Sequence, residues 1–207
     1  MCGIAGFIGK KCAEEELIES LKLLEYRGYD SAGIAVFNKK NIQITKCAGK
    51  ISDLEKQVEN KSSICGIAHT RWATHGKANN INAHPHSSNN KSWAIVHNGI
   101  IENYSTIKKD LSDKGYVFNS DTDTEVIANL LQANNSLHPI DALIKTCNNL
   151  NGSYALCCLN AKNPNTIYLA RKKSPLYVAN KNKCTYIASD PICFASKVDE
   201  YYTLNDD

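Results

Sequence analysis

The chain opens with Met1-Cys2-Gly3-Ile4-Ala5-Gly6-Phe7-Ile8-Gly9, and this apolar stretch predicts the first element of the fold. Its β-branched and aromatic residues predict a strand over residues 3–9, directly preceded by a cysteine. A signal peptide would need a basic segment before the stretch and a cleavage signature after it, and neither is present. The glycine spacing also differs from the dinucleotide-binding fingerprint. We therefore expect a strand of the mature domain here.

The same kind of apolar, β-branched segment recurs along the rest of the chain. Further strands are predicted at 31–37, 41–47, 64–69, 93–97, 153–159, 166–170, 175–179, 184–188 and 201–204. Helical spacing of apolar residues predicts four helices: about 13–25, about 103–114, one opening on a Thr122-x-x-Glu125 capping box, and one from Pro139 that stops by Gly152. Short polar turns between consecutive strands favour antiparallel hairpins. The pattern predicts an α+β fold of two sheets with helices on the outer faces.

Composition narrows the class of protein. A chain of 207 residues with 43% hydrophobic and 22% charged residues is ordinary for one large globular domain or two small ones. The longest apolar run, Tyr154 to Leu159, is far short of the ~20 residues that cross a bilayer, and a net charge of +3 without a basic block argues against nucleic acid. Nine cysteines without a Cys-x-x-Cys pair indicate a reducing cytosol rather than a disulfide framework or structural zinc.

Cys2 is the first candidate for chemistry. Removal of Met1 would leave a thiol and a free α-amine on the same residue. The α-amine titrates near ~7.7–8.0 and the thiol near ~8.5, so such a residue carries both a nucleophile and a base. From position alone, a cysteine that merely begins a strand is the simpler interpretation.

The second candidate is the run His69-Thr70-Arg71-Trp72-Ala73-Thr74-His75-Gly76, which follows a predicted buried strand. It gathers a guanidinium, an indole, two hydroxyls and two imidazoles. The arginine fork suits a carboxylate, because it donates two parallel hydrogen bonds, and the tryptophan could cover a bound ligand. The alternative is a polar loop with a structural tryptophan.

Two further segments offer polar groups. In His97-Asn98-Gly99, the Asn-Gly pair after an apolar strand predicts a hairpin turn, and it also supplies an amide and a neighbouring N–H that suit an oxyanion. In Ser120-Asp121-Thr122-Asp123-Thr124-Glu125, a helix cap is expected, and one aspartate could face a cationic group. His84-Pro85-His86 lacks the helical spacing of a metal site, so we expect no metal and histidines that orient loops by hydrogen bonding.

Taken together, these pieces resemble a known family. The carrying motifs, in chain order, are Cys2-Gly3-Ile4, Tyr26-Arg27-Gly28-Tyr29-Asp30-Ser31-Ala32-Gly33, His69 to Gly76, Asn82-Ala83-His84-Pro85-His86, His97-Asn98-Gly99-Ile100-Ile101-Glu102-Asn103 and Thr122-Asp123-Thr124-Glu125, with Ala188-Ser189-Asp190 as a weaker late match. The chain resembles the class II glutaminase domain of the glutamine–fructose-6-phosphate aminotransferases from residue 2 to its end. The sequence motifs that contain Arg27 and Arg71 favour this branch of the family over the phosphoribosyl-pyrophosphate amidotransferases, asparagine synthetases and glutamate synthases.

The resemblance implies an N-terminal-nucleophile αββα sandwich of two mainly antiparallel sheets between helical layers. It implies that Cys2 attacks the side-chain amide of L-glutamine and forms a thioester, so that glutamate and ammonia are released without a cofactor. Asn98 and Gly99 would hold the oxyanion. Arg71 would bind the substrate carboxylate and Asp123 its ammonium. The assisting residues would be Trp72, Thr74 and His75 around the substrate, with Arg27 supporting Cys2.

The resemblance also sets expectations for the surroundings of the domain. Residues 1–207 would form one glutaminase domain, the sugar-isomerase domains of the family would be absent from this chain, and the full-length enzyme would use the ammonia to make glucosamine 6-phosphate in the cytoplasm. Three alternatives stay open, and the first two are the glutaminase domain of another class II amidotransferase and another N-terminal-nucleophile amide hydrolase. A non-catalytic binding module with an inert Cys2 is a third.

Overall fold

A computed structural model describes residues 2–39, 41–59, 62–72, 77–194 and 197–206. The strands are β1 (Gly3–Ile8), β2 (Ser31–Asn38), β3 (Asn41–Ala48), β4 (Cys65–Arg71), β5 (His86–Ser87), β6 (Trp93–Ile101), β7 (Gly152–Asn160), β8 (Ile167–Lys172), β9 (Tyr177–Lys181), β10 (Cys184–Ala188) and β11 (Tyr202–Thr203). The α-helices are α1 (Ala13–Leu24), α2 (Ile51–Gln57), α3 (Tyr104–Ser112), α4 (Glu125–Ala133) and α5 (Pro139–Cys147), with 3₁₀ turns η1 (Glu25–Arg27) and η2 (Pro191–Phe194).

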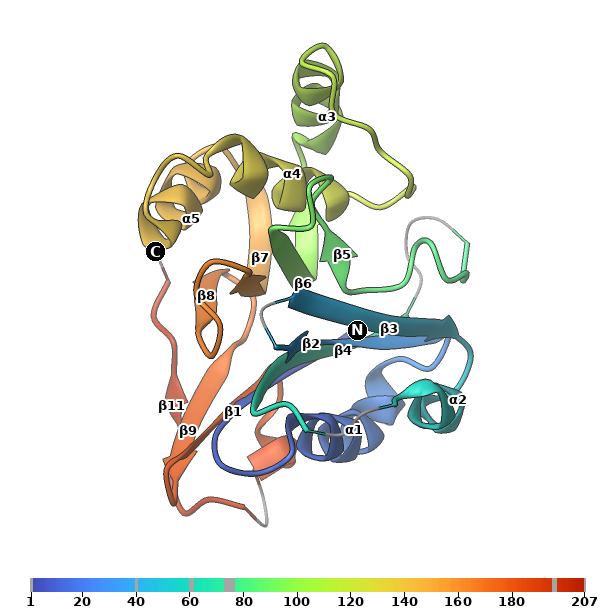
Figure 1. The fold of residues 1–207 in the computed structure, drawn as a ribbon, viewed down its shortest axis with the longest axis vertical. Helices are drawn as coiled ribbons and strands as arrows, with labels where there is room; N and C mark the ends of the chain where they lie inside the picture. Colours follow the sequence, from blue (N-terminus) through green and yellow to red (C-terminus); the bar gives the residue numbers. More distant parts are fainter. Residues whose placement is uncertain (1, 40, 60–61, 73–76, 195–196, 207) are drawn as a thin grey trace.

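The strands form two antiparallel sheets that face each other. The larger sheet has the order β11-β9-β10-β1-β4-β2-β3, and the smaller has the order β5-β6-β7-β8. Helices α1 and α2 lie against the outer face of the larger sheet, whereas α3, α4 and α5 gather on the side of the smaller sheet (Figure 1). The expectation of two mainly antiparallel sheets with helices outside is confirmed. In the part of the chain that is described, no helix is both long and apolar enough to cross a bilayer.

Alternation along the strands explains the layers. On β1, Ala5 and Phe7 face α1, while Ile4 faces the second sheet. The same period of two recurs on β6, where Trp93 and Ile95 contact the helices and Ala94 and Val96 fill the space between the sheets. Successive side chains of a strand point to opposite faces, so each sheet can be apolar on both sides. Every second residue of β1, β4 and β6 therefore projects between the sheets.

The Asn98-Gly99 pair is not a hairpin turn, contrary to the sequence prediction. Strand β6 continues through it to Ile101, and Gly99 pairs with Tyr154 of β7. Gly99 has a φ of +132°, and a Cβ on it would lie 2.0 Å from the carbonyl oxygen of Ser153. The glycine thus allows a close approach of two strands, a contact that the local sequence could not reveal.

The predicted capping box of the third helix is also wrong. Helix α4 begins at Glu125, with Thr124 as its N-cap residue. The Oγ1 atom of Thr122 lies 3.1 Å from His86 Nε2, while the Glu125 carboxylate accepts from the Ser120 N–H at 2.7 Å. A tertiary partner has therefore replaced the local cap. Strand β5 and helix α2 were not expected from the sequence, because the first is only two residues long and the second only seven.

A comparison of Gly99 with Gly115, which both have a positive φ, tests whether the contact with Ser153 requires glycine at position 99. Gly115 has a φ of +87° but no described heavy atom within 4 Å of a Cβ built on it. We expect Gly115→Ala to cost about 1–2 kcal/mol of unfolding free energy from backbone strain alone. Gly99→Ala adds a collision with backbone and should cost at least about 3 kcal/mol. Urea unfolding followed by circular dichroism measures both; equal losses would show that strain alone, and not the contact with Ser153, demands glycine at position 99.

Candidate active site

The candidate residues converge where the space between the sheets opens at one end. Arg71 follows Cys65 and Ile67 on the inner face of β4, Asn98 follows Ala94 and Val96 on the inner face of β6, and Cys2 precedes Ile4 by two residues. One cleft is lined by Cys2, Arg71, Trp72, His84, His97, Asn98, Gly99, Thr122, Asp123 and Thr124. The apolar core thus ends in a polar cleft that receives residues from five distant segments.

The Cys2 thiol is half-buried and contacts the backbone at the end of β4. Its Sγ accepts a hydrogen bond from the Trp72 N–H at 3.4 Å, and the thiol can donate to the Trp72 carbonyl oxygen at 3.7 Å. Burial raises the pKa of the Cys2 thiol, and the bond from the Trp72 amide only partly opposes this effect. At neutral pH the thiol is therefore protonated, and it needs a base before it can attack as a thiolate.

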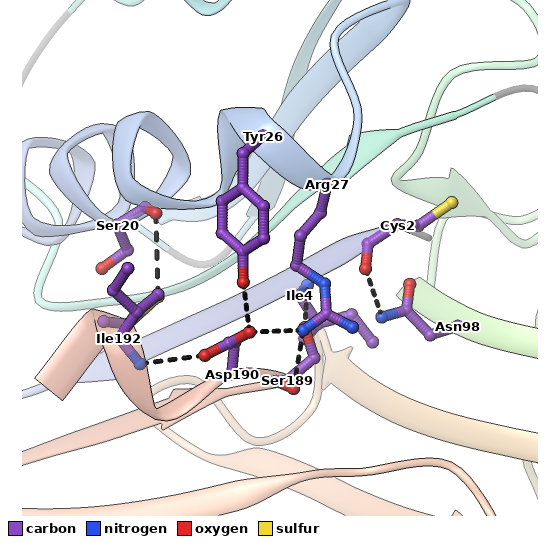
Figure 2. A network of polar contacts seen from close by, with 10 residues as sticks. Cys2, Ile4, Ser20, Tyr26, Arg27, Asn98, Ser189, Asp190 and Ile192 are labelled. Carbon is purple, nitrogen blue, oxygen red and sulfur yellow. Dashed lines mark hydrogen bonds and ion pairs between the residues drawn. The ribbon is translucent and has the colours of Figure 1, made fainter.

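The Asn98 side chain reaches the same residue from the opposite sheet. Its Nδ2 donates to the carbonyl oxygen of Cys2 at 3.1 Å (Figure 2). Gly99 is the next residue of β6 and lines the same cleft. An amide donor and a backbone N–H beside a thiol are the groups that an oxyanion hole combines.

Arg71 and Asp123 give the cleft one positive and one negative group. Arg71 is 4% exposed and ends β4, where it pairs with Ser31 of β2. The Asp123 Oδ2 accepts from the Ile101 N–H at 2.8 Å, which fixes the carboxylate at the end of β6. A guanidinium and a carboxylate in one cleft complement a ligand that carries both a carboxylate and an ammonium, as a free amino acid does.

Arg27 does not line the cleft and belongs to a network beside β1. Its Nη1 forms an ion pair with Asp190 at 2.6 Å, and the Tyr26 hydroxyl donates to the same carboxylate (Figure 2). Burial disfavours the ionised form of Asp190, but the bonds from Tyr26, Ile192 and Arg27 outweigh it, and its pKa is lowered. The adjacent Ser189 accepts from the Ile4 N–H at 2.9 Å, so the network ties η1 to the strand that carries Cys2.

Four buried histidines lie beneath and beside the cleft. Burial lowers the pKa of His69 to about 3, places the pKa of His84 and His86 well below 6.5, and lowers that of His97. Thr124 Oγ1 lies 2.9 Å from both His84 Nε2 and His97 Nδ1. These neutral rings orient the segment around Asp123 by hydrogen bonds, which agrees with the expectation from the sequence.

Two of the predicted binding residues cannot be compared with the cleft. Thr74 and His75 lie outside the described residues. Within the described ranges, no three His, Cys, Asp or Glu side chains are grouped as metal ligands. His84, Thr122 and Thr124 also line the cleft, although the sequence did not predict a place for them there. The signal for Thr122 and Thr124 was the dense run of polar residues between Ser120 and Glu125, which predicted mainly a helix cap, and the signal for His84 was the motif Asn82-Ala83-His84-Pro85-His86.

Solved structures share this architecture. Glutamine phosphoribosylpyrophosphate amidotransferase from B. subtilis matches with a TM-score of 0.81 and 27% sequence identity, over 93% of this chain and 43% of that chain. A structure described as the allosteric regulatory enzyme of purine biosynthesis matches with a TM-score of 0.82 and 26% identity over the same shares. The fold is the αββα sandwich of the N-terminal-nucleophile amidotransferases.

Sequence comparison identifies the family to which the chain belongs. The model of the glutamine amidotransferase domain family matches residues 69–196, and the chain belongs to this family. The glutamine–fructose-6-phosphate aminotransferase (isomerizing) of Clostridium acetobutylicum is 45% identical over 208 aligned residues, which cover all of this chain and 34% of that protein. Its counterpart from Caldanaerobacter subterraneus subsp. tengcongensis is 48% identical over the same shares. The chain spans about a third of the length of these curated relatives.

The raised pKa of Cys2 predicts slow alkylation at neutral pH in the chain that retains Met1. The thiolate reacts and the thiol does not, so the rate with iodoacetamide should climb about tenfold per pH unit from pH 7 and still be rising at pH 9. Peptide mass spectrometry after timed quenching measures the rate at Cys2, and the exposed thiol of a free cysteine peptide serves as the reference. A plateau below pH 8 would contradict the raised pKa.

Proposed function

We propose that this chain is a glutaminase that hydrolyses the side-chain amide of L-glutamine to glutamate and ammonia. The observation that carries the proposal is one cleft, in a glutamine amidotransferase domain, that holds the Cys2 thiol, the Asn98 amide, the Arg71 guanidinium and the Asp123 carboxylate. The first two are suited to attack on an amide carbonyl, and the last two are suited to the amino-acid end of the substrate.

The proposed reaction begins after Met1 has been removed. The α-amine of Cys2 takes the thiol proton, directly or through water, and the thiolate attacks the amide carbon of the substrate. The Asn98 Nδ2–H and the Gly99 N–H stabilise the oxyanion. The protonated α-amine gives its proton to the leaving nitrogen, the C–N bond breaks, and ammonia departs from a Cys2 thioester. Water then attacks the thioester, with the amine again as base, and glutamate leaves.

The proposed binding contacts explain why free glutamine is the substrate. Arg71 donates to the α-carboxylate, Asp123 accepts from the α-ammonium, and Trp72 covers the cleft at the level of Cys2. Thr74 and His75 assist in binding, and Arg27 supports the strand that carries Cys2. The ring contact between Tyr29 and Trp72, at 5.3 Å between centroids, supports a defined position for the indole.

We further propose that residues 1–207 act as one glutaminase domain whose ammonia serves a sugar-isomerase unit. The identity to glutamine–fructose-6-phosphate aminotransferases over the whole chain supports fructose 6-phosphate as the acceptor, with glucosamine 6-phosphate as the product. Residues for the sugar chemistry would belong to the sugar-isomerase domains of the full-length enzyme. All nine cysteines are free, which supports the cytoplasm as the place of action.

Product analysis tests the proposed function. A sample shown by intact mass to lack Met1 should convert glutamine into equal amounts of glutamate and ammonia, and should form no glucosamine phosphate when fructose 6-phosphate is added. Cys2→Ala should abolish hydrolysis, whereas Cys12→Ala, at the half-buried start of α1, should keep it. Full hydrolysis by a sample that retains Met1, or by Cys2→Ala, would refute the mechanism.

Two substitutions should separate binding from chemistry. Arg71→Lys replaces a two-pronged donor by a point charge and should raise KM about tenfold or more, because the carboxylate contact exists in the ground state and in the transition state. Asn98→Ala removes a donor to the developing oxyanion and should lower kcat by about 10²–10³-fold with little change in KM. Steady-state kinetics with glutamine measures both, and the reverse pattern would mean that the two roles are exchanged.

A further inference from the structure

His69 has no role in the proposed reaction, yet it lies directly behind the cleft. It is fully buried on β4, where it pairs with Ile4 of β1 and with Gly33 of β2. Its side chain follows Cys65 and Ile67 on the inner face, and it crosses the space between the sheets to reach β6. The N–H group of a ring in this position needs an acceptor within the protein, because the ring is fully buried.

The hydrogen-bond partners of His69 determine which of its two ring nitrogens carries the proton. Its Nε2 lies 3.1 Å from the carbonyl oxygen of His97 and 3.0 Å from Oδ1 of Asn98. The carbonyl oxygen can only accept, so Nε2 must carry the proton. Burial lowers the pKa of His69 to about 3, so the ring is neutral and Nδ1 is the unprotonated nitrogen. Nδ1 has no hydrogen-bond partner among the residues that the structure describes, which agrees with this tautomer.

The tautomer in turn defines the orientation of the Asn98 amide. With a proton on His69 Nε2, the Asn98 atom that faces it must be the oxygen, and the NH₂ group must face the Cys2 carbonyl at 3.1 Å. A flipped amide would place its NH₂ against an N–H of His69 and its oxygen against a carbonyl oxygen. Both contacts would be repulsive. The ring of His69 is also held in place, because it contacts the His84 ring at 4.1 Å between centroids with a tilt of 41°, and His84 is hydrogen-bonded to Thr124.

We propose that His69 is the positioning residue that fixes the Asn98 amide with its NH₂ group toward Cys2. The inference rests on the proposed function, in which that NH₂ group stabilises the oxyanion. His69 touches neither Cys2 nor the substrate in this scheme. It acts through Asn98, and its tautomer is set by the backbone carbonyl of His97.

Kinetics of two variants tests the proposal. His69→Phe keeps an apolar ring but removes the donor, and it should lower kcat for glutamine by about tenfold or more, up to the ~10²–10³-fold that loss of an oxyanion donor costs, with KM within about threefold. His69→Gln places an N–H near the position of Nε2 and should recover much of the loss. His69→Asn places its N–H nearer to Nδ1 and should not. If His69→Phe does not fold, the contrast between Gln and Asn decides, and equal losses would overturn the proposal.

A double-mutant cycle tests whether His69 acts through Asn98. The variant His69→Phe with Asn98→Ala should be no slower than Asn98→Ala alone, because an absent amide cannot be misoriented. His86→Phe is a matched control from the same cluster: it removes a buried histidine that bonds to Thr122 and not to Asn98. Its effect should multiply with that of Asn98→Ala. If the His69 and Asn98 effects multiply as well, His69 does not act through the amide.

A measurement without turnover separates this proposal from the proposed function. The ¹⁵N shifts of the His69 ring report which nitrogen carries the proton, and they should show a neutral ring with the proton on Nε2 from pH 5 to pH 8. A proton on Nδ1 would overturn the role of His69 even in an active glutaminase. If the tautomer is as expected but the wild-type chain without Met1 does not hydrolyse glutamine, the proposed function fails, and the role of His69 in catalysis fails with it.

Discussion

The site depends on the hydrogen bonds that hold strand β1 on both edges. β1 lies between β4 and β10, and each neighbour pairs with it in antiparallel register. A strand in the middle of a sheet cannot slip by one residue without turning its buried side chains to the wrong face. Cys2 precedes this strand directly, so the position of its thiol follows from the register. The Asn98 bond to the Cys2 carbonyl then joins the second sheet to the same point.

The polar end of the inter-sheet space is stable because its groups are neutral or paired. His69, His84 and His97 would each cost several kcal/mol as isolated buried cations, and burial keeps them uncharged instead. Each ring forms hydrogen bonds through one nitrogen, whereas the other nitrogen (His69 Nδ1, His84 Nδ1 and His97 Nε2) has no partner among the described residues. The carbonyl oxygen of His97 fixes the proton of His69 on Nε2, and the neutral rings contact Asn98 and Thr124 without adding net charge beside the thiol.

Much of this arrangement could be predicted from the sequence. Segments rich in β-branched and apolar residues predicted most strands, and short turns together with helical spacing predicted two sheets with helices outside. The motifs around Cys2, Arg71 and Asn98 indicated groups that the structure brings into one cleft. The failures have one cause. The Asn98-Gly99 pair was interpreted as a turn, and Thr122 as a cap, because the partners that decide both, Ser153 and His86, are distant in sequence. Local patterns describe local bonds, and these residues use tertiary ones.

The pairing of β1 with β10 also has a consequence for the order of events during synthesis. The Ile4 N–H donates a hydrogen bond to Ser189, and Ala5 pairs with Ala188. The first strand therefore pairs with residues that leave the ribosome more than 180 residues later. At ~5–20 residues per second, that interval lasts about ten to forty seconds. Until it ends, β1 lacks one of its two neighbours, and Arg27 lacks Asp190. The strand that follows Cys2 therefore stays unpaired on one edge until residues 184–190 have been synthesised.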